Sequence, residues 1–173
     1  MSSDWQKTLK LHELSRGPVA FRLEAGAEDR AAIARQLGLE SLAALNAEIT
    51  AKSWFDGVEI TGRVQAVVGQ ICGVTLDPFE QPVDSRFEIR AVPANSPHAQ
   101  PADGGVIDLD LEAPDAPDVM TGDMIDITAY VIEQLALELD PFPRKPGATF
   151  SYEPPVEEIS PFAALRKLNE PKP

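Results

Sequence analysis

The most regular stretch of the sequence is residues 45–68, LNAEITAKSWFDGVEITGRVQAVV. Apolar and polar residues alternate along both halves, which is the period of a strand with one buried face and one solvated face. Between the halves stands Asp56-Gly57, the dipeptide favoured by a two-residue type I′ turn. Phe55 and Val58 flank this turn, so we expect both apolar sets to face one core. The stretch predicts two long antiparallel strands at the centre of a sheet.

Shorter strand patterns lie on both sides of this hairpin. Residues 7–13 and 19–23 alternate about a Gly-Pro break, which predicts an N-terminal edge hairpin. Gly69 interrupts the alternation as a bulge would, and after the turn Asp77-Pro78 the alternation resumes over residues 82–93. Short connections favour an antiparallel meander over βαβ units, which need longer helical crossovers.

Two short helical patterns precede the hairpin. Residues 27–37, AEDRAAIARQL, have high helix propensity, and Gly38 is placed to end the helix in a left-handed cap. Ser41 is a candidate N-cap for one further turn, SLAAL, before the first long strand.

A third helix is predicted within residues 125–147, IDITAYVIEQLALELDPFPRKPG. Asp126 can cap its start, and Pro141 ends it because proline lacks a backbone donor and restricts the residue before it. The prolines that follow stiffen a segment carrying Arg144 and Lys145, so we predict that these two cations bind a partner. The apolar stripe of the helix consists of Thr128, Val131, Ile132, Leu135 and Leu139.

Together these elements predict one α+β domain over residues 1–150. An antiparallel meander of about five to seven strands, able to curl into a partial barrel, carries about two or three helices. Residues 94–123 form a long acidic loop rich in Pro, Gly and Ala, and residues 106–112, VIDLDLE, read as one edge strand within it. Residues 151–173 form an extended tail with a short amphipathic motif at 160–168, SPFAALRKL. The predicted docking face of this motif consists of Phe162, Leu165 and Leu168.

The charge of the chain is unevenly distributed. The net charge is -13, which argues against a non-specific grip on nucleic-acid phosphates or on an anionic membrane surface. Residues 91–143 contain no lysine or arginine but eleven acidic residues, so the acidity is local. Within this region we predict Asp108 and Asp110 as contacts for a basic partner. The sequence shows neither an apolar run long enough to span a bilayer nor a signal-peptide pattern, so we expect a cytoplasmic protein with no membrane partner.

No catalytic or metal-binding pattern stands out. Cys72 is the one cysteine, so it cannot form an intramolecular disulfide, and no local motif links it to His12 or His98. Asp108 and Asp110 have the spacing of calcium ligands, but the loop lacks the glycine and the bidentate glutamate of an EF-hand. We therefore predict no catalytic residue, no metal and no cofactor. Two alternatives stay open: a metal-dependent hydrolase or nuclease that uses clustered carboxylates, and a generic acidic chaperone for basic clients.

Two blocks carry a resemblance to a known family: residues 70–79, QICGVTLDPF, and residues 125–147, above all EQLALELDPFPRKPG. Together with the terminal SPFAALRKL they resemble the YceD family of large ribosomal RNA subunit accumulation proteins. The single cysteine and the Leu-Asp-Pro turn are similar to the alphaproteobacterial branch of this family. The resemblance implies structural roles for Cys72, Leu76, Asp77, Pro78, Gln134, Leu135, Asp140, Pro141, Pro143, Pro146 and Gly147. Many relatives carry a CxxC here. In this chain its two positions hold Cys72 and Thr75, so a zinc role does not transfer.

The resemblance implies a non-catalytic factor needed for synthesis, processing or stability of the large-subunit (23S) ribosomal RNA. Because the chain is acidic, we expect the region 91–143 to contact a basic ribosomal protein or a pre-large-subunit particle. Arg144 and Lys145 would touch RNA phosphate or the same assembly, and contact with ribosomal RNA can be indirect. A monomer is expected.

Overall fold

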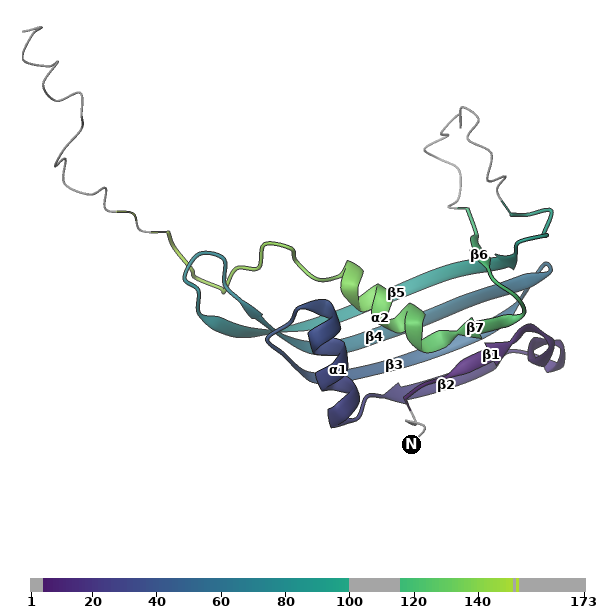
Figure 1. The fold of residues 1–173 in the computed structure, drawn as a ribbon, viewed down its shortest axis with the longest axis horizontal. Helices are drawn as coiled ribbons and strands as arrows, with labels where there is room; N and C mark the ends of the chain where they lie inside the picture. The colour runs from purple at the N-terminus through teal and green to yellow at the C-terminus, as the bar shows by residue number, and fades with distance from the viewer. Residues whose placement is uncertain (1–4, 100–115, 151, 153–173) are drawn as a thin grey trace, which may run out of the picture.

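The computed structural model describes residues 5–99, 116–150 and 152, and its described part is an α+β fold with two sheets (Figure 1). The five-stranded sheet has the order β2-β3-β4-β5-β6 and is open, and β1 and β7 form a separate two-stranded sheet. All strand pairs are antiparallel except β5–β6. In chain order the elements are β1 (Thr8–Lys10), the 3-10 helix η1 (Leu11–Arg16), β2 (Val19–Glu24), α1 (Ala27–Leu37), β3 (Ser41–Trp54), β4 (Gly57–Ile71), β5 (Pro78–Pro93), β6 (Asp118–Met120), β7 (Met124–Asp126) and α2 (Ile127–Leu137).

The predicted central hairpin is confirmed as β3 and β4, but its turn lies one residue earlier than predicted. Trp54 pairs with Gly57, so the loop is Phe55-Asp56. Of the two loop residues, only Phe55 has a positive φ, 50°, which is the pattern of a type II′ turn rather than a type I′ turn. Gly57 lies in the strand opposite Trp54, and only glycine fits there because a Cβ atom would lie 2.1 Å from the carbonyl oxygen of Ala91. Phe55 is therefore 69% exposed instead of facing the core.

The predicted helical turn at Ser41 is wrong, because β3 already begins at this residue. The register of β3 shifts between Leu42 and Ala44, so an extra residue is accommodated there. Leu42 and Leu45 are consequently both buried although they are three positions apart, a spacing that imitates a helix. The bulge is thus on β3 and not at Gly69, where a Cβ atom would lie 2.1 Å from Ser41 Oγ.

The predicted N-terminal hairpin is also wrong. β1 pairs with β7, where Leu9 stands opposite Ile125, and β2 pairs with β3. The chain leaves β1 because residues 11–16 coil into η1. The carboxylate of Glu13 accepts a hydrogen bond from the backbone N–H of Lys10 at 2.9 Å, and Leu14 is buried. Short-range alternation could not reveal a strand partner more than a hundred residues away.

Both helices keep their predicted starts. α1 covers the predicted residues exactly, and Gly38 ends it with φ 66°. Asp126 caps α2, accepting a hydrogen bond from the backbone N–H of Ala129 at 2.9 Å. α2 ends at Leu137, before the predicted stop near Pro141, because Glu138 and the residue after it bond three positions back and tighten the last turn. Neither helix is long and apolar enough to cross a membrane.

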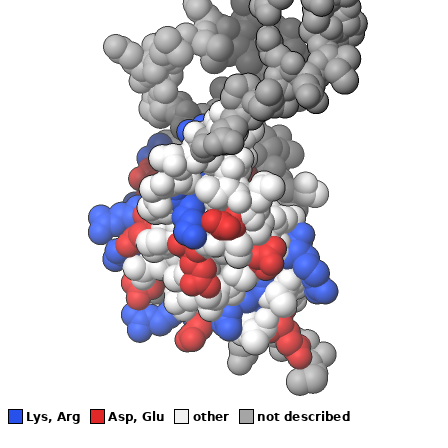
Figure 2. Space-filling view, turned by 90° about the vertical axis from the view of Figure 1, so that its left-hand side faces the viewer, with Lys and Arg blue, Asp and Glu red and all other residues white. Residues whose placement is uncertain are grey.

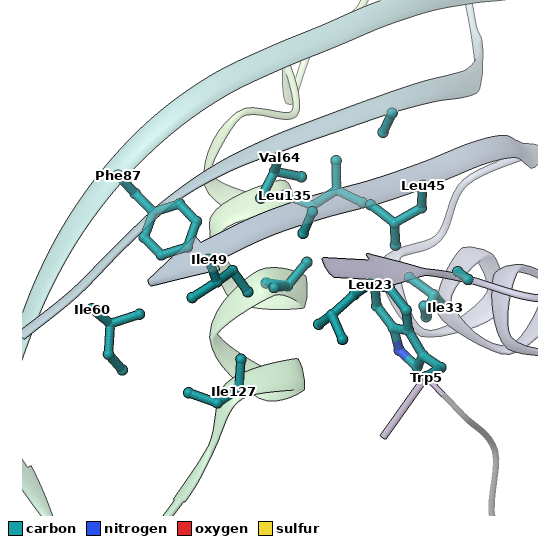
Figure 3. Close-up of a cluster of buried hydrophobic side chains, with 14 of the residues drawn as sticks. Trp5, Leu23, Ile33, Leu45, Ile49, Ile60, Val64, Phe87, Ile127 and Leu135 are labelled. Atoms are coloured by element: carbon teal, nitrogen blue, oxygen red, sulfur yellow. The ribbon is translucent and has the colours of Figure 1, made fainter. Parts of the chain in front are cut away.

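The core lies between the inner face of the sheet and the helices (Figure 3). α2 presents Ile127 and Leu135 to sheet residues such as Ile60 and Val64. Each of these side chains is essentially fully buried, which stabilises the fold by about 1.5–3 kcal/mol per residue. The opposite face of β2–β5 carries polar and charged residues, and no described element covers it.

The predicted acidic loop 94–123 is partly structured. β6 lies within it and pairs in parallel with the end of β5, Val92 standing opposite Val119. Three residues were too few to show an alternation. The predicted strand at 106–112 and the tail motif at 160–168 lie outside the described residues. β5 starts at Pro78, four residues before the predicted strand.

Candidate functional site

Two segments 73 positions apart in the sequence meet beside the β4–β5 loop, at the left-hand end of Figure 1. The backbone N–H of Gly73 donates to the carbonyl oxygen of Pro143 at 2.9 Å. The side-chain Nε2 of Gln70 donates to the carbonyl oxygen of Asp140 at 3.2 Å. We call this contact the Cys72 junction. It comprises residues 70–78 and 140–147, which belong to the two blocks that carry the family resemblance.

The thiol of Cys72 lies at the centre of the junction. Its side chain is fully buried, and its Sγ atom accepts hydrogen bonds from the backbone N–H groups of Val74, Thr75 and Lys145, each at 3.4 Å. Hydrogen bonds to a thiolate favour the charged form. The side chain of Thr75, followed by the backbone donors, lowers the pKa of Cys72 to about 6. The sulfur is therefore an acceptor that gathers both segments around itself.

The loop that follows Cys72 is a tight turn. The backbone N–H of Cys72 donates to the carbonyl oxygen of Asp77, and the carbonyl oxygen of Cys72 accepts from the backbone N–H of Leu76, both at 2.9 Å. Leu76 has φ 61°, and its side chain is 75% exposed. A leucine in a left-handed conformation is uncommon, so the turn is held by its surroundings rather than by its own preference.

The facing segment turns twice after α2. The carboxylate of Asp140 accepts a hydrogen bond from the backbone N–H of Phe142 at 2.8 Å, which fixes a bend at the exposed Pro141. A second turn follows Pro146, where Gly147 has φ 80°. Two predicted family-motif residues are placed outside the junction: Leu135 in the core and Gln134 half-buried on α2. Pro78 ends the first junction segment at the start of β5.

The two cations of this segment are not equivalent. The backbone of Lys145 binds Cys72, and its Nζ atom lies 3.7 Å from the carboxylate of Asp77, which draws the side chain back onto the junction. Arg144 is exposed, and within the described residues no carboxylate lies in ion-pair range of it. Figure 2 shows basic and acidic side chains interspersed on this end of the molecule, without a continuous field of one sign.

A second candidate surface lies beside the N-terminal half of α2. We call it the acidic groove. It has a volume of about 520 Å³, and it contains no lysine or arginine. Its charged and apolar lining includes Asp118, Val119, Met124, Asp126, Tyr130 and Glu133.

The acidic groove combines negative charge with exposed apolar surface. Val119 and Met124 are each 53% exposed. Burial, followed by the charge of Asp118 and the hydrogen bond to it, raises the pKa of Tyr130 to about 12, so its hydroxyl stays protonated. The sequence predicted an acidic contact surface in this third of the chain, but not these apolar residues, because isolated exposed apolar residues leave no periodic pattern.

Several predicted contacts lie outside the described residues. They are Asp108, Asp110, Phe162, Leu165 and Leu168. In the described ranges no three His, Cys, Asp or Glu side chains are grouped so that they could hold a metal ion.

The histidines lie at the opposite end of the sheet from the thiol. His98 stacks on Phe55 at the β3–β4 turn, with ring centroids 4.1 Å apart. His12 belongs to η1, which contacts β3 near the same turn through Ser53. Cys72 follows the far end of β4, so the fifteen residues of this strand separate it from both imidazoles.

The described part of the chain is thus an α+β protein with one open five-stranded sheet and an acidic groove beside α2. Two sequence blocks that are distant in the chain meet at a buried thiol. Residues 60–169 match the model of the family described as large ribosomal RNA subunit accumulation protein YceD. The match covers well over half of the chain, and the chain belongs to this family. The family description connects it with accumulation of the large ribosomal RNA subunit. Neither the curated proteins nor the solved structures gave a significant match.

Proposed function

We propose that this protein supports accumulation of the large-subunit (23S) ribosomal RNA as a non-catalytic binding factor. It holds a basic ribosomal protein, either free or within a pre-large-subunit particle. The observation that carries the proposal is the acidic groove, where Asp118 and Glu133 flank exposed Val119 and Met124. No lysine or arginine lines this groove, and Arg90 lines an adjoining pocket that shares the two carboxylates.

The composition of the groove fits a segment that is both basic and apolar. Charge complementarity raises the rate of encounter and selects against acidic partners. Val119 and Met124 supply the contact area that gives affinity, and methionine adapts its shape to different partners. A basic protein segment therefore fits this surface better than nucleic acid, which the carboxylates would repel.

The Cys72 junction adds a second contact in this proposal. It fixes the backbone of Lys145 beside the loop after β4, so the neighbouring Arg144 projects from an anchored segment. An anchored cation loses less conformational freedom on binding than one on a free tail. Arg144 would contact RNA phosphate or an acidic group of the same assembly.

The non-catalytic part of the proposal is supported by the surroundings of the one thiol. Cys72 is buried, its sulfur already accepts three backbone donors, and neither histidine is near it. A nucleophilic cysteine needs an accessible thiolate and a neighbouring base.

The proposal is tested by removing two charges from the groove. In the double variant Asp118→Asn/Glu133→Gln, we expect capture of basic ribosomal proteins from lysate at low salt to fall at least several-fold. Expressed in a strain depleted of the wild-type protein, the variant should restore the large-subunit RNA poorly. The matched control is Glu40→Gln/Glu80→Gln, which removes two exposed charges away from the groove.

Equal capture by the groove variant, the control and the wild type would contradict the proposal. So would normal ribosomal RNA levels in the depleted strain. Hydrolysis of RNA by the purified protein that is lost on Asp108→Asn/Asp110→Asn would favour the hydrolase alternative instead.

A further inference from the structure

The outer face of the five-stranded sheet carries a row of arginines. Arg22 of β2 stands opposite Glu48 of β3, Glu48 opposite Arg63 of β4, and Arg63 opposite Arg86 of β5. All four side chains are exposed and lie on one face, because directly paired residues share a face of the sheet. We call Arg22, Arg63 and Arg86 the arginine row.

The row has more positive than negative charge. Arg22 forms an ion pair with Glu48 at 2.6 Å, and Arg63 forms a bidentate ion pair with both carboxylate oxygens of Asp84. Arg86 has no ion pair within the described residues, although it stands directly opposite Arg63. Like charges placed opposite each other destabilise a sheet. The nearby carboxylate of Asp84, whose pKa is lowered first by Arg63 and also by Arg86, offsets only part of this repulsion.

Another set of charged residues on this face, four positions along β4 from Arg63, is balanced within itself. Glu59 is only 7% exposed, and it pairs with Lys52 at 2.5 Å and with Arg90 at 3.4 Å. Arg90 also binds Glu88 at 2.5 Å, which balances the charges. The pKa of Glu59 is lowered, first by its hydrogen bond with Lys52, so this network stays ionised. The arginine row lacks such a closed balance.

The arginine row borders a shallow groove of about 570 Å³. Thr50 and Thr61 lie in the adjacent ladder on the same face and add hydroxyl groups to the lining of this groove. Guanidinium and hydroxyl groups are hydrogen-bond donors that suit phosphate oxygens, and a guanidinium can bind a phosphate with two parallel bonds.

We propose that the arginine row is a binding site for the phosphates of an RNA backbone. Neighbouring strands lie about 4.8 Å apart, so the row extends over roughly 14 Å from β2 to β5. A line of cations of this length fits a repeated anion better than a single small one. Glu48 and Asp84 hold Arg22 and Arg63 in exposed pairs, which contribute little to stability. Phosphates can therefore replace these carboxylates.

The net charge of -13 does not prevent this contact. The arginine row lies on the outer face of the sheet, while the acidic groove lies on the side of α2. Salt reduces interactions between exposed charges over about 8 Å at physiological ionic strength. The site does not depend on the proposed binding of a basic protein, which uses the other side of the sheet.

The test measures binding of the full-length protein to a labelled single-stranded RNA oligonucleotide by fluorescence anisotropy across a salt series. Arg86→Gln should weaken binding several-fold. It should also reduce the slope of log K against log salt by about 0.7, the value for one lost phosphate contact on a single strand. Arg22→Gln/Arg63→Gln/Arg86→Gln should bring binding to the level of a non-interacting control protein. Arg86→Gln should change the melting temperature little, because the loss of repulsion from Arg63 offsets the loss of the exposed attraction to Asp84.

Two further variants test for a gain of RNA binding and provide a control for the loss of charge. Glu48→Gln releases Arg22, so it should strengthen RNA binding, whereas a purely structural role of the pair predicts no gain. Arg35→Gln removes one exposed cation of α1, away from the row, and should leave RNA affinity near that of the wild type.

Three results would overturn the inference. They are absence of RNA binding by the wild-type protein at low salt, equal loss of binding in Arg35→Gln and Arg86→Gln, and binding of polyglutamate as tight as that of RNA. The acidic-groove variant Asp118→Asn/Glu133→Gln should keep RNA binding. The experiments therefore distinguish a failure of the RNA-binding proposal for the arginine row from a failure of the protein-binding proposal for the acidic groove.

Discussion

The backbone N–H of Lys145 donates to the Sγ atom of Cys72 at 3.4 Å and links residues 73 positions apart. This bond places a sulfur, rather than a carbonyl oxygen, as the acceptor that anchors the segment after α2. The same sulfur also fixes the β4–β5 loop through Val74 and Thr75. Loss of this one side chain therefore weakens the attachment of both segments, which the bonds from Gly73 to Pro143 and from Gln70 to Asp140 still join.

Replacing Cys72 by Ala should loosen the whole junction. The backbone donors of Val74, Thr75 and Lys145 lose their acceptor, and a buried donor without a partner is destabilising. We expect a lower melting temperature and faster amide hydrogen exchange at Gly73 and Lys145. Unchanged exchange at Lys145 would show that the sulfur does not anchor this segment.

The contribution of Cys72 to stability should depend on pH. The folded protein holds the pKa of this thiol at about 6, below its ordinary value of 9.0. A lowered pKa stabilises the fold above the unfolded value, and this stabilisation is lost as the pH falls through the folded value. The difference in unfolding free energy between the wild type and Cys72→Ser should therefore grow from about pH 5 to pH 9. A difference that is constant with pH would contradict the thiolate.

Two glycine substitutions should differ sharply in their effect. At Gly57 a Cβ atom would lie 2.1 Å from the backbone oxygen of Ala91, so Gly57→Ala should cost about 1–3 kcal/mol or more. At Gly73 the nearest contact is 3.7 Å from the oxygen of Pro143, so Gly73→Ala should be nearly neutral. Urea unfolding of both variants checks this. Similar destabilisation of the two variants would mean that the backbones of β4 and β5 can move apart near Gly57.

Substitution of the two cations at the junction should separate binding from folding. Lys145→Ala loses one exposed ion pair with Asp77, worth about 0–1 kcal/mol, and Arg144→Ala loses no ion pair within the described residues. Neither should change the melting temperature by more than a few degrees. If the segment is a contact, association with ribosomal particles should weaken, and Arg144→Ala should weaken it more. Sedimentation with particles in a salt gradient measures this.

The sequence predicted elements that depend on local patterns. The alternation in β3 and β4, the left-handed cap at Gly38 and the N-cap at Asp126 were all readable, because each depends on residues within a few positions. Pairings across long separations were not readable. The partner of β1 is β7, and neither three-residue strand carries enough residues to show its period.

The candidate sites were predictable to different degrees. The two blocks around Cys72 and Arg144 were identified by resemblance, but nothing in either block shows that they touch. Arg22, Arg63 and Arg86, which form the arginine row, occupy polar positions in the alternating patterns of three strands. The row becomes visible only when the register places these residues opposite one another, since their order along the chain gives no hint of it.

Hydrogen bonds of Thr128 attach the N-terminal segment to α2, and they bear on the order in which the chain folds. Thr128 Oγ1 donates to the carbonyl oxygen of Trp5 at 3.0 Å and accepts from the backbone N–H of Lys7 at 2.9 Å. These contacts join residues more than 120 positions apart, so we expect them to form after the hairpins. A fragment that starts at residue 60, where the family match begins, would lack β1, β2, α1 and β3, so β4 would lose its paired strand and part of the core would be exposed. We therefore expect that the residues matching the family do not fold stably on their own.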